Sequence, residues 1–260
     1  MKVEAIVLAG ASNRGALGSV SDASHEALIL LRGRPMIDYV LDALRACPSI
    51  TRILVVGPAA RMEQCCDLRG VELCDAGGSL VENLQIGIER LQPSGPVLVV
   101  TSDIPLISPE AVEDFIRRCE ELSADIYYPI VSREVNEARF PGMRRTYVRL
   151  KEGVFTGGNL VLLKPEIVAS CREMIAQAVA MRKNPLQLSR LLGFTFILKL
   201  LCNRLTLREI EERVRLILGF RGVAIISPYP EVGIDVDKPE DLHLVEAALR
   251  ARKEEQRATE

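Results

Sequence analysis

Apolar and polar stretches alternate regularly along the first half of the chain, and they predict strands and helices in turn. The run from Val3 to Leu8 is almost wholly apolar and ends at Ala9-Gly10, which is typical of a buried parallel strand. Pro35 then precedes apolar residues spaced for one face of a helix. The same pattern predicts strands at Ile53 to Val56, Val71 to Leu73 and Pro96 to Val100, and helices at Leu80 to Leu91 and Pro109 to Leu122.

This alternation favours right-handed βαβ units. The fold class predicted is therefore α/β, with three layers: a mostly parallel sheet and helices on both of its faces. Ser108 stands in the position of an N-cap before the helix that begins at Pro109.

The second half of the chain is less regular. Leu186 to Leu218 is expected to be helical with breaks near Gly193 and Asn203, as part of a helical region at about 183–220. The charged tail 252–260 is expected to be frayed, and residues 1–260 form one predicted domain because no linker divides them. Further strands are predicted at Ile126 to Val131, Arg145 to Leu150, Leu160 to Leu163 and Val223 to Ile226, with an extended piece at Gly233 to Val236 and helices from Pro165 and at Pro239 to Arg250.

The most apolar stretch, Phe194 to Cys202, is interrupted by Lys199 and is much shorter than the roughly 20 residues that span a bilayer. We expect no membrane span. Core packing and a subunit interface, and hence a homodimer, are the alternatives left open for this stretch.

Composition narrows the possible functions. The net charge is −2, only 4% of residues are aromatic and Trp is absent, so neither a basic field nor stacking platforms for nucleic acid are expected. The chain has seven cysteines without a C-x-x-C pair and only two histidines, which argues against a zinc site. The odd cysteine count and an opening without a signal-peptide pattern favour a cytoplasmic protein. The adjacent Cys65 and Cys66 are interpreted as packed thiols rather than a redox device.

The loop after the first strand is a candidate phosphate-binding segment. Its small residues allow a ligand to approach the backbone, whose consecutive N–H groups bind anions. Arg14 adds a charged donor, and the loop lies at the carboxyl end of a strand, where ligands bind in open α/β sheets. The alternative is a plain connection, since the segment matches neither the dinucleotide fingerprint nor the Walker pattern.

Two acidic segments are candidate Mg²⁺ sites, because Mg²⁺ prefers hard oxygen ligands, often one or two carboxylates together with phosphate. Asp103 ends the strand Pro96 to Val100, just before Pro105, and its alternative role is to cap the following turn. Asp235 and Asp237 alternate in an extended segment and therefore share one face. For Asp237 we favour helix capping over metal binding.

Together, these segments resemble the molybdenum-cofactor guanylyltransferase-like (MobA-like) nucleotidyltransferases, which have the Rossmann-like nucleotide-diphospho-sugar transferase fold. The resemblance covers roughly Val3 to Leu249. It rests on Leu8-Ala9-Gly10-Ala11, Gly33-Arg34-Pro35-Met36, Glu82 to Gly87, Ser102-Asp103-Ile104-Pro105-Leu106 and Asp235 to Leu242, in that order.

The resemblance implies a Mg²⁺-dependent nucleotidyltransferase that moves a nucleotidyl group from a nucleoside triphosphate to a phosphorylated small-molecule acceptor. Asp103 and Asp235 would hold the metal, and Arg14 would assist catalysis. The implied nucleotide-binding residues are Leu8, Ala9, Gly10, Ala11, Ser12, Asn13, Asn83 and Ser102, and the implied acceptor-binding residues are Gly157, Gly158 and Asn159.

Glu26 departs from the family pattern, which has a lysine at this position of the loop. A carboxylate there removes one source of charge neutralisation at the triphosphate. Two alternatives to an active enzyme therefore stay open. One is a degenerate relative that binds nucleotide as a sensor. The other is a scaffold that assembles through the helical region, in which Leu200 and Leu201 would lie at the interface.

Overall fold

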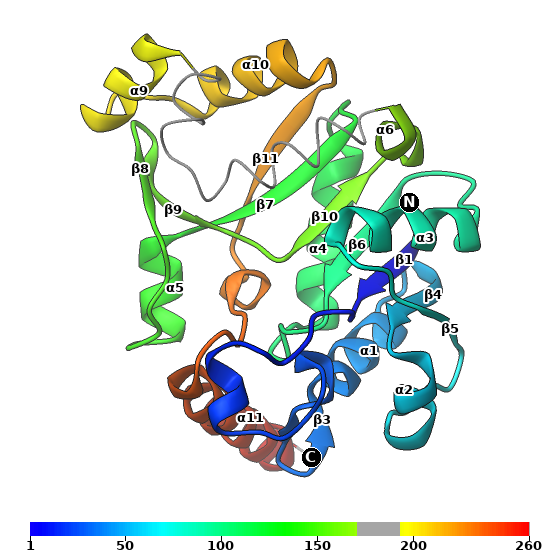
Figure 1. Cartoon of the computed structure of the whole chain (residues 1–260). Coiled ribbons are helices and arrows are strands. Elements are labelled where there is room, and N and C mark those ends of the chain that lie inside the picture. The colour runs from blue at the N-terminus through cyan, green and yellow to red at the C-terminus, as the bar shows by residue number, and fades with distance from the viewer. Residues whose placement is uncertain (171–192, 260) are drawn as a thin grey trace.

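A mixed sheet forms the centre of the protein (Figure 1). The structure is a computed structural model that describes residues 1–170 and 193–259, so the predicted helical residues 183–192 lie outside the described part. The strands of the sheet are β1 (Val3–Leu8), β4 (Ile50–Gly57), β5 (Val71–Asp75), β6 (Val97–Thr101), β7 (Ile126–Ser132), β8 (Val148–Leu150), β9 (Gly153–Gly157), β10 (Leu160–Leu163) and β11 (Gly222–Ser227).

The strand order is β5-β4-β1-β6-β10-β7-β9-β8, and β11 pairs in parallel with β7. β1 runs parallel to both of its neighbours, with Leu8 opposite Val56 of β4 and Thr101 of β6. Their carboxyl ends therefore reach the same edge of the sheet. β10 runs antiparallel to β6 and β7, so the sheet is mixed but mostly parallel. The predicted fold class is confirmed. The short strands β2 (Leu30–Leu31) and β3 (Arg34–Pro35) pair separately.

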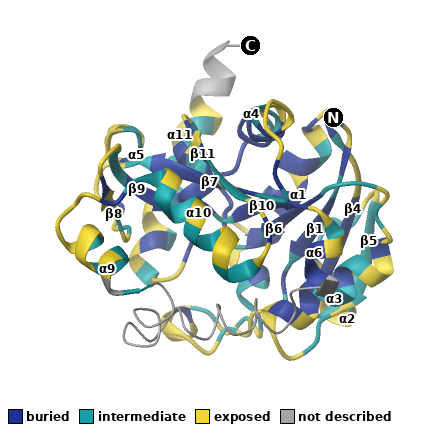
Figure 2. Ribbon diagram, turned by 90° about the horizontal axis from the view of Figure 1, so that it is seen from above, coloured by how far each residue is buried: buried dark blue, intermediate teal, exposed yellow. Residues whose placement is uncertain are grey.

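Helices cover both faces of the sheet. The apolar residues of α1 and α4 pack with Ala5 and Val7 of β1 on one face, whereas those of α3 and α6 pack with Ile6 on the other. This alternation of burial along β1 is what a strand covered on both faces requires. Figure 2 shows the buried residues concentrated along the strands. The helices are α1 (Met36–Ala46), α2 (Ala59–Cys65), α3 (Leu80–Leu91), α4 (Pro109–Glu120), α5 (Arg133–Arg139), α6 (Pro165–Ser170), α9 (Phe194–Leu201), α10 (Leu207–Leu218) and α11 (Pro239–Thr259).

Local signals in the sequence fix several helix boundaries. The predicted N-cap is confirmed: the Ser108 hydroxyl accepts a hydrogen bond of 3.2 Å from the Ala111 N–H at the start of α4. The predicted break near Asn203 also occurs, because Asn203 (φ +54°) lies between α9 and α10. Gly193 (φ +91°) directly precedes α9. These two helices pack over β7 to β9 through a small cluster that includes Leu205 and Phe155.

The structure differs from the predicted elements in several places. Neither α5, in the polar stretch after β7, nor β9 was predicted. Both elements are short, and β9 has glycine at each end. The extended piece predicted from Gly233 begins as a 3₁₀ turn, η3 (Pro230–Gly233). The strand predicted from Arg145 begins at Val148, and α11 continues past the predicted Arg250 through the tail to Thr259. Among the described helices, none is long and apolar enough to cross a membrane.

Candidate functional site

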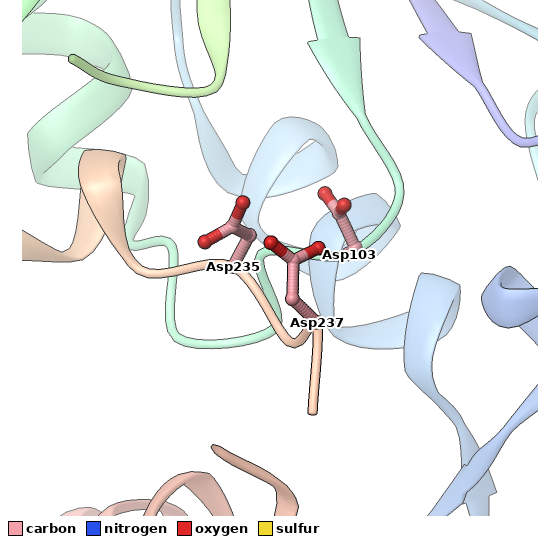
Figure 3. A group of neighbouring side chains, drawn as sticks. All are labelled: Asp103, Asp235 and Asp237. Atoms are coloured by element: carbon pink, nitrogen blue, oxygen red, sulfur yellow. The ribbon is translucent and has the colours of Figure 1, made fainter. Parts of the chain in front are cut away.

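Three aspartates from two distant parts of the chain meet at one edge of the sheet (Figure 3). Asp103 follows the end of β6, and Asp235 and Asp237 lie between η3 and α11. One carboxylate oxygen from each residue lies within 4.8 Å of those of the other two. The backbone joins the two segments, because the N–H of Val236 donates a 2.9 Å hydrogen bond to the carbonyl of Asp103. The predicted pair, Asp103 and Asp235, is therefore brought together.

The environment of these carboxylates suits a cation. Oδ1 of Asp103 is buried and accepts no hydrogen bond from the described residues. Burial and the negative charge of Asp235 raise the pKa of Asp103 to about 7. Burial and Asp235 also raise the pKa of Asp237. A hard divalent ion would give the unpaired Asp103 oxygen a partner and would offset the repulsion between the aspartates, so this set of oxygen donors fits Mg²⁺.

Arg145 provides the positive charge that the structure itself places against this cluster. Its guanidinium forms an ion pair with Oδ1 of Asp235, and its Nη1 donates to the backbone carbonyl of the same residue at 3.4 Å. The side chains are only 11% and 16% exposed, so the pair is screened little by solvent. Arg145 was not predicted as a site residue. It lies before β8, and only the fold brings it to Asp235.

A pocket of about 350 Å³ opens beside Asp103 at the carboxyl ends of β1 and β6. Most residues of the predicted nucleotide-binding set line it, whereas Ala9 is fully buried in the core. The Asn13 amide instead donates to the carbonyls of Ser21 and Ala23, at 2.9 and 3.0 Å. The lining residues are Leu8, Gly10, Ala11, Ser12, Glu26, Gly77, Gly78, Ser79, Leu80, Asn83, Thr101, Ser102 and Asp103.

Asn83 has a structural task in this pocket. Its Oδ1 accepts a 2.6 Å hydrogen bond from the N–H of Gly77. A Cβ at Gly10 would lie 2.7 Å from Nδ2 of Asn83 and 2.7 Å from Cβ of Ala76, so glycine is required there for packing alone. Gly77 and Gly78 were not predicted as site residues, and the structure adds them to the pocket wall.

The charges in this pocket are unusual for a phosphate site. Among the lining residues that the structure describes, Glu26 and Asp103 are charged and none is a cation. Burial and the charge of Asp237 raise the pKa of Glu26. Arg14 is exposed and lines neither this pocket nor the larger cleft described next, so its catalytic role stays a prediction.

A second cleft, of about 1080 Å³, lies on the other side of the acidic cluster. The predicted acceptor residues Gly157, Gly158 and Asn159 all line it, together with Asp235 and Asp237. The residues that the sequence did not point to are Tyr128, Gly142, Arg144, Arg145, Thr146, Val148, Thr156, Lys238, Glu240, Asp241 and Leu244.

Asp241, not Asp237, caps the last helix. Its Oδ2 accepts hydrogen bonds from the N–H groups of Asp237 and Lys238, at 3.1 and 3.0 Å. The capping role favoured for Asp237 was therefore wrong. The carboxylate that accepts hydrogen bonds from the start of the helix belongs to its third residue, Asp241. Asp237 is left to join the acidic cluster.

Known proteins share this fold and its sequence pattern. A family model described as the MobA-like NTP transferase domain matches residues 5–191, so Asp235 and Asp237 lie beyond the match. A hypothetical transferase of known structure from Thermus thermophilus is 42% identical, with a TM-score of 0.83, over 93% of this chain and 100% of that chain.

More distant proteins agree with the fold. The bifunctional protein GlmU of Parvibaculum lavamentivorans is 35% identical over 107 residues, which is 35% of this chain and 22% of GlmU. The chain thus spans about a fifth of the length of that curated relative. A CMP:2-keto-3-deoxy-manno-octonic acid synthetase, solved with CTP, is 15% identical with a TM-score of 0.62 over 97% of this chain and 100% of that chain. On the family model and the Thermus structure, the chain belongs to the MobA-like NTP transferase family of nucleotidyltransferases.

Proposed function

We propose that the protein transfers a nucleotidyl group from a nucleoside triphosphate to a phosphorylated small-molecule acceptor, with Mg²⁺ as cofactor and pyrophosphate as the second product. The convergence of Asp103 and Asp235 between two clefts carries this proposal. One cleft is bounded by the loop after β1, and the other contains three cationic side chains. The fold relative solved with CTP supports a nucleoside triphosphate as the donor.

Asp103 and Asp235 would hold the metal, with Asp237 as a further oxygen ligand. When bound, Mg²⁺ offsets the negative charge of the triphosphate and of the pyrophosphate that leaves. The backbone N–H groups of Gly10, Ala11 and Ser12 would bind phosphate oxygens, because a loop of small residues lets the backbone approach them closely.

The reaction needs no covalent intermediate on the protein. An oxygen of the acceptor phosphate attacks the α-phosphorus and forms the new P–O bond. The bond from the α-phosphorus to the bridging oxygen breaks, and pyrophosphate leaves with the electron pair. The attacking oxygen is already ionised, so no general base is required. The protein contributes position and charge neutralisation, which are the main sources of catalysis in such transfers. Arg145, held against Asp235, supplies positive charge on the acceptor side.

A nucleotide sensor without turnover is the second candidate, and Glu26 favours it. Within the described parts of the chain, the lining of the pocket beside Asp103 contains two carboxylates and no cation. A triphosphate bound there would depend on metal for its neutralisation. The sensor and the enzyme both predict metal-dependent nucleotide binding, and only the enzyme predicts pyrophosphate release.

Substitution of the metal-binding aspartates tests the proposal. Asp103→Asn and Asp235→Asn are each expected to raise the barrier by on the order of several kcal/mol, because each removes a charged metal ligand. Pyrophosphate release is measured with each of the four triphosphates and Mg²⁺, and calorimetry with Mn²⁺ gives a separate reading of metal affinity. Asp42→Asn on α1 is the matched control, since Asp42 forms ion pairs with Arg34 and Arg45 at the surface and does not belong to the acidic cluster.

Loss of Mn²⁺ binding together with pyrophosphate release in both site variants, but not in Asp42→Asn, is the expected result. Full turnover in both site variants would contradict the assignment of the two aspartates. Nucleotide binding in the native protein without pyrophosphate from any acceptor would instead favour the sensor.

A further inference from the structure

The lining of the larger cleft combines positive charge with exposed apolar side chains. Arg144, Arg145 and Lys238 contribute positive charge to its lining. Arg144 and Lys238 are exposed, and neither forms a salt bridge with any residue in the ranges 1–170 and 193–259. Two cations thus lie at the wall without a salt-bridge partner among the described residues.

Apolar side chains are also exposed in this cleft. Tyr128 of β7, Val148 of β8 and Leu244 of α11 are 41%, 44% and 37% exposed, and all three line it. They come from three separate elements, which the fold brings to one concave surface. Exposed apolar groups in a concave site contribute most when a ligand removes them from water.

The acidic cluster shows which side of the cleft carries the positive charge. Arg145 is paired with Asp235, and Lys238 directly follows Asp237 in the chain, and all four residues line the cleft. The cationic side of the cleft is therefore the side next to the aspartates. An acceptor phosphate must lie there to reach the α-phosphorus. The rest of the acceptor then extends over the remaining lining, to which the three apolar side chains belong.

Asn159 adds a neutral donor to the same wall. Its Nδ2 is buried and donates no hydrogen bond to the described residues. Its backbone carbonyl is already used, because it accepts from the N–H of Thr101 at 3.1 Å. An unsatisfied buried N–H costs free energy, and an oxygen of a ligand would relieve it.

We infer that the acceptor is an amphiphilic phosphate monoester: its phosphate binds to Arg144, Arg145 and Lys238, and its apolar body packs on Tyr128, Val148 and Leu244. This inference rests on the proposed function for the direction in which the acceptor is bound. It excludes a short polyol phosphate as the preferred acceptor, because hydroxyl groups gain nothing from apolar walls.

Three probes distinguish the affinity for the phosphate from the affinity for the apolar body: inorganic phosphate, glycerol 3-phosphate and hexyl phosphate. Calorimetry on the nucleotide-free full chain gives their dissociation constants. Hexyl phosphate is expected to bind at least about tenfold more tightly than glycerol 3-phosphate, since each buried methylene contributes roughly fourfold in affinity.

Two variants are expected to weaken different parts of this binding. Arg144→Gln is expected to weaken all three probes by a similar factor, about tenfold, through loss of a charged hydrogen bond. Leu244→Gln is expected to weaken hexyl phosphate alone. The controls are Arg149→Gln, on β8 but outside the cleft, and Leu216→Gln, on α10 and 77% exposed; neither should alter any probe.

Equal binding of hexyl phosphate and glycerol 3-phosphate would overturn the inference, and so would equal loss of both in Leu244→Gln. The proposed function is tested separately, by the release of pyrophosphate from a nucleoside triphosphate in the presence of Mg²⁺. Because the probes are measured without nucleotide, a failure of one test is not a failure of the other.

Discussion

A single buried carboxylate should make the stability of the metal-free protein depend on pH. Burial and the charge of Asp235 raise the pKa of Asp103 from 3.8 to about 7. The folded protein therefore holds this proton more tightly than the unfolded chain does. Between about pH 4 and pH 7 the contribution of Asp103 to the free energy of unfolding falls as pH rises.

Urea unfolding with a chelator present measures this effect. From pH 5 to pH 7 the native protein is expected to lose about 2 kcal/mol more stability than Asp103→Asn, which has no titrating group at this position. The difference in slope is what matters, because other groups titrate equally in both proteins. Parallel pH profiles for the two would show that Asp103 does not carry the shift.

Glu26 permits a test in which affinity should increase. It lines the pocket beside Asp103, to which residues 1–170 and 193–259 contribute no cation. Glu26→Lys is expected to tighten binding of a triphosphate with Mg²⁺ by roughly tenfold, because a repulsive charge becomes an attractive one. Calorimetry measures the change, with the exposed Glu63→Lys on α2 as a control of equal charge. Weaker binding in Glu26→Lys would mean that the native carboxylate helps to hold the cation.

At the scale of elements, Gly158 in the turn between β9 and β10 has a packing role that can be tested without a ligand. A Cβ at Gly158 would lie 2.8 Å from Cγ of Pro129 and 3.1 Å from the carbonyl oxygen of Val232. Gly158→Ala is expected to cost about 1–3 kcal/mol of stability, because a backbone atom cannot easily move aside. Thermal unfolding measures the loss. Gly95→Ala is the control, since a Cβ there meets nothing within 4 Å, and equal stability of the two variants would contradict the packing role.

The elements that could be predicted from the sequence are those with strong local patterns. α3 begins and ends at the predicted residues because Ser79 caps it and its apolar positions follow one face. β9 could not be predicted, since its five residues show no alternation and it is stabilised by pairing with β7 and β8. α5 has only seven residues, and its cap, Ser132, is also the last residue of β7.

At the scale of the whole molecule, the acidic cluster was predictable and the wall around it was not. Asp103 and Asp235 each follow a recognisable local signal, a strand end and an extended acidic segment. Arg145, Tyr128 and Leu244 have no such signal, because they become neighbours only through the order of β7, β8 and α11 around the sheet. Whether the helical region forms a homodimer interface stays a prediction.

The hydrogen bond from the Val236 N–H to the carbonyl of Asp103 joins two segments that the ribosome synthesises at different times. During synthesis, the ribosome completes β1 to β10 long before it adds Asp235 and Asp237. A nascent chain that has emerged only as far as α10 already has β6 and Asp103, but it lacks two of the three aspartates. The acidic cluster is therefore completed only after every strand of the sheet has been made.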